Sequence, residues 1–86
     1  MINPNNLKDL SNELENMLGT PVGTKILEKI TEGQRKLLAT LIYKWTQGED
    51  NSQTVYSILD YGKSKLKPKE YSDKTKFYLK DKNLIK

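Results

Sequence analysis

The apolar positions of the chain recur with helical spacing, most densely over residues 34–48. In that stretch they stand at positions i, i+1, i+4, i+5 and i+8 and are Leu37, Leu38, Leu41, Ile42 and Trp45. This spacing lines one face of an α-helix. Thr31 and Gln34 have the three-residue separation of a capping box, and Gly48 stands where a left-handed residue would end the helix. We therefore expect a central helix here, with the only tryptophan in the core.

An amphipathic helix is predicted before it, near the N-terminus. Asn3 and Pro4 match the preferred N-cap and first helical residue, and Gly19 follows the last apolar position. Its apolar face consists of Leu7, Leu10, Leu14, Met17 and Leu18. The simpler interpretation is that this face packs on the protein's own core, and the alternative is that a partner binds it.

Thr20 and Pro21 repeat the same start signal, which predicts a short helix over residues 21–30. A break is expected at 31–33, where Gly33 lies. Because glycine costs a helix interior only about 1 kcal/mol relative to alanine, one bent helix over 21–47 is the alternative. We expect two helices.

A fourth helix is predicted after Gly48, capped by Asn51 or Ser52 and stopped by Pro68. Its inward face consists of Val55, Ile58, Leu59, Gly62 and Leu66, with Tyr56 and Tyr61 at the flanks. A last helix is expected either to start at once at Pro68 or to run over residues 73–82 after a cap at Ser72. The sequence as a whole predicts an all-α protein, a compact bundle of four to five short helices forming a single domain over 1–86.

The residue types present exclude several kinds of chemistry. The chain has no cysteine and no histidine, which excludes disulfides, thiolate or imidazole metal sites, and a cysteine or histidine catalytic centre. It carries neither of the glycine-rich phosphate-binding motifs, GxxxxGK[ST] and GxGxxG. Its serines have no histidine to activate them. We expect a non-enzymatic protein without a cofactor. With no apolar run of the ~20 residues that a membrane span needs, and no signal peptide, we also expect a cytoplasmic protein.

Charge is unevenly distributed along the chain. Residues 1–59 contain six basic and seven acidic residues, a net −1, whereas residues 60–86 contain nine lysines and four acids, a net +5. Lysines interleaved with aromatic residues are typical of phosphate and base contacts. The predicted nucleic-acid-binding residues are Lys74, Thr75, Lys76, Tyr78, Lys80 and Lys82. The alternative is that these lysines form an ordinary solvated surface.

Two functions remain open on this sequence. The helices predicted over 31–86 are similar in outline to the trihelical core of helix-turn-helix domains, which together with the lysines favours nucleic-acid binding. Because Arg35 is the only arginine and lies outside the basic region, phosphate contacts should dominate over base reading. The second function is protein interaction, as an adaptor, assembly factor or small inhibitor, through the first helix and through Tyr43, Trp45, Tyr56 and Tyr61. Either function is compatible with a monomer or a homodimer.

Overall fold

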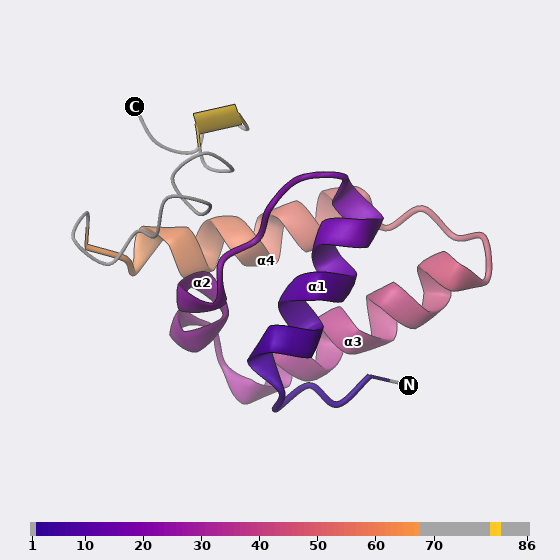
Figure 1. Ribbon diagram of the computed structural model, residues 1–86, viewed down its shortest axis with the longest axis horizontal. Coiled ribbons are helices and arrows are strands. Elements are labelled where there is room, and N and C mark those ends of the chain that lie inside the picture. The colour runs from indigo at the N-terminus through magenta and orange to yellow at the C-terminus, as the bar shows by residue number, and fades with distance from the viewer. Residues whose placement is uncertain (1, 68–79, 82–86) are drawn as a thin grey trace.

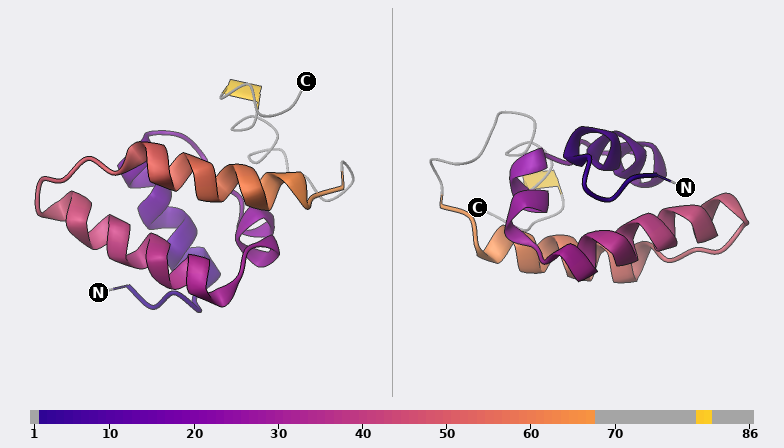
Figure 2. Two further views of the ribbon diagram at one scale, coloured as in Figure 1. Left: turned by 180° about the vertical axis from the view of Figure 1, so that it is seen from behind. Right: turned by 90° about the horizontal axis from the view of Figure 1, so that it is seen from below.

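The computed structural model describes residues 2–67 and 80–81, which are helical with no strand among them. Residues 2–67 contain four helices, α1 (Leu7–Leu18), α2 (Thr24–Lys29), α3 (Glu32–Thr46) and α4 (Ser52–Ser64). Helices α3 and α4 run antiparallel, α1 crosses one face of this pair, and α2 closes one end (Figures 1 and 2). The predicted all-α fold is confirmed.

Helix α1 begins later than predicted. The Asn3 side chain accepts a hydrogen bond from the Asn5 N–H at 2.9 Å, and the Asn6 N–H donates to the Asn3 carbonyl at 3.1 Å. Residues 3–6 therefore close a turn, and Asn6 is the N-cap, with its Oδ1 accepting from the Asp9 N–H at 3.2 Å. The expected cap at Asn3 is wrong, whereas the expected stop at Gly19 is confirmed by its left-handed φ of 73°.

Residues 21–47 form two helices, as expected, although the first is shorter than predicted. Helix α2 starts at Thr24, after an N-cap at Gly23 with extended backbone, and residues 21–23 lie outside any helix, so the start signal at Pro21 is not used. The break comes at Ile30 and Thr31, which both have extended backbones, and Gly33 lies inside the first turn of α3.

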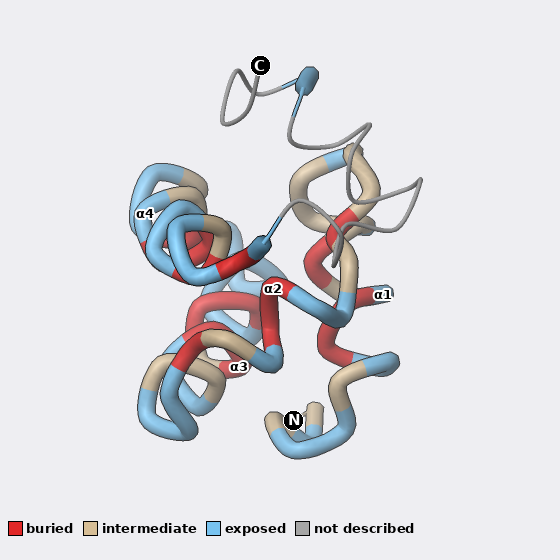
Figure 3. Tube along the Cα trace, turned by 90° about the vertical axis from the view of Figure 1, so that its left-hand side faces the viewer, coloured by how far each residue is buried: buried red, intermediate tan, exposed pale blue. Residues whose placement is uncertain are grey.

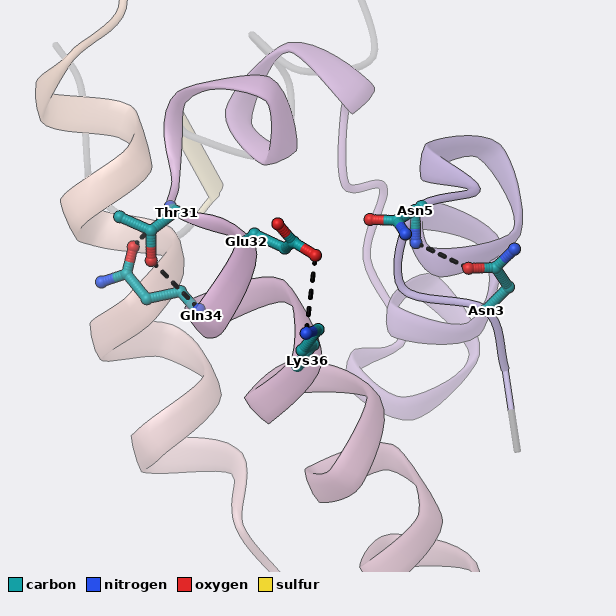
Figure 4. A network of polar contacts seen from close by, with 6 residues as sticks. All are labelled: Asn3, Asn5, Thr31, Glu32, Gln34 and Lys36. Carbon is teal, nitrogen blue, oxygen red and sulfur yellow. Dashed lines mark hydrogen bonds and ion pairs between the residues drawn. The ribbon is translucent and has the colours of Figure 1, made fainter.

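Both ends of α3 match the sequence signals. Thr31 Oγ1 accepts from the Gln34 N–H at 3.1 Å while Gln34 Oε1 accepts from the Thr31 N–H at 2.9 Å, a complete capping box (Figure 4). At the other end Gly48 is left-handed with φ 95°, and its N–H donates to the Trp45 carbonyl at 3.0 Å.

The core lies where the four helices meet (Figure 3). Its members come from every helix and are Leu10, Leu14, Val22, Ile26, Leu27, Ile30, Leu38, Leu41, Ile42, Val55, Ile58, Leu59 and Leu66. The predicted inward face of α4 is buried at all five positions. The apolar face of α1 also packs on this core, with Leu10 and Leu14 fully buried, so the simpler interpretation of that face is correct.

Two residues expected in the core are exposed. Leu37 retains 43% of its accessible surface and Trp45 retains 37%. The buried face of α3 is centred on Leu38, Ala39 and Ile42, so Leu37 falls at its edge. Trp45 lies in the last turn of α3 and lines a surface hollow beside the α3–α4 connection rather than the space between helices.

Helices α2 and α4 come very close at Gly62. A Cβ added at Gly62 would lie 2.8 Å from the Ile26 carbonyl oxygen and 2.8 Å from the Cγ2 atoms of both Ile26 and Ile30. Only a residue without a side chain fits there, which explains a glycine on the buried face of a helix.

The remaining expectations concern the C-terminal part and the membrane. Lys80 and Asp81 have helical backbone and are exposed, but residues 68–79 and 82–86 lie outside the described residues, so the helix over 73–82 stays a prediction. Helix α4 ends at Ser64, ahead of Pro68. None of the helices in the described part of the chain is long and apolar enough to cross a membrane.

Candidate functional site

Some polar side chains make hydrogen bonds that the fold itself needs, and these side chains are not available for function. Ser11 is buried and its hydroxyl donates a hydrogen bond to the Val22 carbonyl. Glu15 Oε1 accepts from the Val22 N–H at 3.0 Å. Both backbone groups of Val22, in the connection between α1 and α2, are thus satisfied by α1. Sequence inspection missed this pair because neither side chain belongs to a recognisable motif.

The only arginine also has a structural role. Arg35 Nη1 donates to the carbonyl oxygens of Leu27 and Ile30 at 3.0 and 2.8 Å. These carbonyls belong to the C-terminal end of α2, where backbone acceptors lack partners within the helix. Arg35 therefore joins α3 to α2 and its guanidinium is directed into the fold.

A similar structural role belongs to the polar turn before α4. Asp50 Oδ1 accepts from the Ser52 N–H at 3.1 Å and from the Ser52 hydroxyl at 2.7 Å. These two bonds lower the pKa of the Asp50 carboxyl, because both favour its ionised form. Asn51 is the N-cap residue of α4, as expected, but its side chain makes no capping hydrogen bond, and Asp50 instead bonds the N–H of Ser52, the first helical residue.

A groove of about 390 Å³, open to solvent, lies between α1 and α3. Helix α3 contributes the mainly apolar side, with Ala39 and Ile42 buried and Tyr43 half-exposed. Helix α1 contributes the polar side through Asp9, Asn12 and Glu13, while Ile2 and Thr46 complete the lining. We call this the α1–α3 groove.

The α1–α3 groove carries unbalanced negative charge. Asp9 and Glu13 stand four residues apart on α1, which places them on the same side of the helix one turn from each other. In residues 2–67 neither carboxylate takes part in an ion pair, and no lysine or arginine lines the groove. By contrast, Glu32 pairs with Lys36 at 3.5 Å on the outer surface of α3 (Figure 4).

Large apolar side chains are exposed on α3 and α4. Leu37, Tyr43 and Trp45 of α3 retain 43, 49 and 37% of their accessible surface, and Tyr61 of α4 retains 42%. Tyr43 borders the α1–α3 groove, whereas Trp45 borders the hollow at the α3–α4 connection.

Most of the predicted nucleic-acid-binding residues cannot be placed. Lys74, Thr75, Lys76, Tyr78 and Lys82 lie outside the described residues, and Lys80 is exposed. The described beginning of the basic region is the end of α4 and the residues after it, with Lys63, Lys65 and Lys67. There the Lys65 ammonium lies 5.2 Å from the centroid of the Tyr61 ring, a cation–π contact at the surface.

The described residues contain no group of three or more acidic side chains able to hold a metal ion. No protein-family model, curated protein or solved structure matches the chain. The case for a function therefore rests on the α1–α3 groove, the exposed apolar side chains of α3 and the lysines.

Proposed function

We propose that this chain is a non-catalytic interaction module that binds a protein partner through the surface of α3 and the neighbouring side of α1. The observation that carries the proposal is the exposure of Leu37, Tyr43 and Trp45 on different sides of α3, with Tyr43 at the α1–α3 groove, while the core is filled by other side chains. Aromatic side chains of this kind dominate the energetics of protein interfaces, because each buries a large area on binding.

The proposed partner surface keeps Tyr43 and Trp45 from the surface expected from the sequence but leaves out the apolar face of α1. The apolar face of α1 was the alternative candidate, but Leu10 and Leu14 of that face are fully buried in the core. A partner that covers Tyr43 or Trp45 instead would remove apolar surface from water, which is favourable by about 25 cal/mol per Å². It would do so without disturbing the packing of the core. Helix α3 is therefore the better candidate.

Site-specific photocrosslinking tests the proposal. A benzophenone side chain placed at Tyr43 or Trp45 is expected to form discrete adducts with the same partner protein in cells that naturally contain the chain. The matched control is Gln53, an exposed polar position on α4. Adducts of equal number and yield at Gln53, or none at either aromatic position, would contradict the proposal.

A second candidate function is nucleic-acid binding through the lysine-rich C-terminal third. It is favoured by exposed Lys65 and Tyr61 in contact at the end of α4 and by exposed Lys80. Because Arg35 is bound to the carbonyls of α2, the chain offers only lysines for contact, which suits phosphate binding better than base reading. The helix-turn-helix outline stays a prediction, since the third helix lies outside the described residues.

A salt titration with generic duplex DNA tests this second function. The affinity should fall steeply, with a log–log slope of about −0.9 for each phosphate contact. Lys80→Gln should reduce the slope by about one contact, whereas Lys8→Gln on α1 should leave it unchanged. Undetectable binding at low salt, or an equal loss from both variants, would exclude it.

A further inference from the structure

We infer that the α1–α3 groove binds a cationic amphipathic segment of the partner, one that presents a lysine or arginine together with large aliphatic side chains. This inference rests on the proposed function and specifies the chemistry of the partner. The occupant is a protein segment. Its aliphatic side chains contact the apolar side of the groove, on α3, and its basic side chain contacts the charged side, on α1.

The apolar side of the groove is suited to aliphatic side chains. Its volume of about 390 Å³, open to solvent, leaves room for side chains of a partner. Ala39 and Ile42 are already buried there, and the Tyr43 ring is half-exposed beside them. An aliphatic side chain packed against this surface would cover the Tyr43 ring, which the fold itself leaves in contact with water.

The charged side selects for a basic partner. Asp9 and Glu13 present two carboxylates one helical turn apart, with no basic side chain among the described residues that line the groove. A guanidinium or ammonium group entering between them would gain charge-assisted hydrogen bonds, whereas an acidic segment would meet two like charges. The charge of the groove therefore distinguishes between otherwise similar amphipathic segments.

The Glu13 carboxylate is not explained by the needs of the fold. Glu15, two residues later, accepts a hydrogen bond from the Val22 N–H. Asp9 lies in the first turn of α1, where the helix dipole makes negative charge favourable. Glu13 has neither role, although its side chain is half-buried against the groove. Glu13 is thus the residue whose substitution tests the inference most directly.

The experiment is an NMR titration of the full-length, ¹⁵N-labelled chain with two synthetic helical peptides. Both peptides have the same leucine pattern, but one carries lysine and the other glutamate at the polar positions. We expect the leucine–lysine peptide to shift the amides of Asp9, Glu13, Ala39 and Tyr43, and the leucine–glutamate peptide to leave them unchanged.

Two charge reversals provide the matched comparison. Glu13→Lys should weaken the leucine–lysine peptide about tenfold, the effect expected for a charge that contacts its partner across an interface. Asp60→Lys makes the same change of net charge at an exposed position of α4 and should change the affinity less than about twofold. A thermal melt of each variant establishes that both are folded.

Several results would overturn the inference. One is that the leucine–lysine peptide does not bind, and another is that the two charge reversals weaken its binding equally. A third is that the groove amides shift with protein concentration alone, which would identify a second copy of the chain as the occupant. Shifts around Trp45 instead of the groove would also overturn it but would leave the proposed function standing, because photocrosslinking tests that function independently.

Discussion

At the scale of single residues, the polar side chains of this protein divide into those that complete the backbone's hydrogen bonds and those that do not. Ser11, Glu15 and Arg35 contact backbone groups of other segments, whereas Asp9 and Glu13 face solvent at the groove. Helical spacing places Glu13 and Glu15, two residues apart, on different sides of α1. It could not assign the roles, because each role depends on where Val22 and α3 lie in space.

Gly62→Ala is expected to destabilise the protein. Alanine is the better helix former by about 1 kcal/mol, but its Cβ would lie 2.8 Å from the Ile26 carbonyl, and overpacking of this kind typically costs about 1–3 kcal/mol. Gly33→Ala is the matched control, since the nearest atom to its Cβ is Thr31 Oγ1 at 3.9 Å. Urea unfolding should show Gly33→Ala equal to or more stable than the parent and Gly62→Ala less stable. A Gly62→Ala variant as stable as Gly33→Ala would refute the close α2–α4 contact.

Asp50 should make a small contribution to stability that depends on pH. Its pKa is lowered in the folded state by the hydrogen bonds from Ser52, so the contribution is present above the unfolded-state pKa and is lost as pH falls through the folded-state pKa. Thermal melts between about pH 6 and pH 2 should therefore show a smaller acid-induced loss in Asp50→Asn than in the parent. Asp60→Asn removes a charge elsewhere on the surface and serves as the control. Identical acid profiles for Asp50→Asn and the parent would contradict the role of Asp50.

At the scale of elements, local signals located the ends of α3 but not the starts of α1 and α2. The capping box and Gly48 act within a few residues of the helix that they delimit, so they could be found in the sequence. Asn3 and Thr20 satisfy the same local rules, yet residues 3–6 close a turn and Val22 is held in an extended connection by α1. Those starts were decided by contacts between segments, which local patterns do not contain.

Thr31→Ala should remove the N-cap of α3 and lower the free energy of unfolding by about 1 kcal/mol. The physical reason is that the Gln34 N–H loses the acceptor that lies 3.1 Å away. Thr54→Ala, at an exposed position within α4, is the control and should change stability little. Chemical denaturation of the two variants measures the difference, and equal values would mean that the cap contributes nothing.

At the scale of the whole molecule, helical periodicity predicted which side of each helix faces inward but not how wide the buried face is. The four helices and the two-helix division of residues 21–47 followed from apolar spacing together with start and stop signals, and the inward face of α4 followed from spacing. Leu37 was wrongly placed in the core because it falls at the edge of the buried face of α3, and Trp45 because it lies in the last turn, beside the α3–α4 connection. The α1–α3 groove was not predicted either, since it arises where two helices with unrelated sequences meet.

The contrast between buried and exposed large residues can be measured directly. Leu59 is fully buried, so Leu59→Ala should cost about 2–5 kcal/mol through lost burial and the cavity left behind. Trp45→Ala removes a larger side chain but one that is 37% exposed and borders a surface hollow, and a smaller loss is expected. Denaturant unfolding compares them. Equal losses of unfolding free energy from Trp45→Ala and Leu59→Ala would show that Trp45 contributes to the core as much as Leu59 does.

The hydrogen bonds at Val22 also connect the fold to a measurable motion. Its amide lies outside any helix, yet the Glu15 carboxylate 3.0 Å away shields its hydrogen while α1 is in place. Deuterium can replace that hydrogen only when the bond to Glu15 opens, so the exchange rate at this single amide reports how often the contact between α1 and the connection opens. A partner that clamps α1 against α3 would slow that exchange without touching Val22.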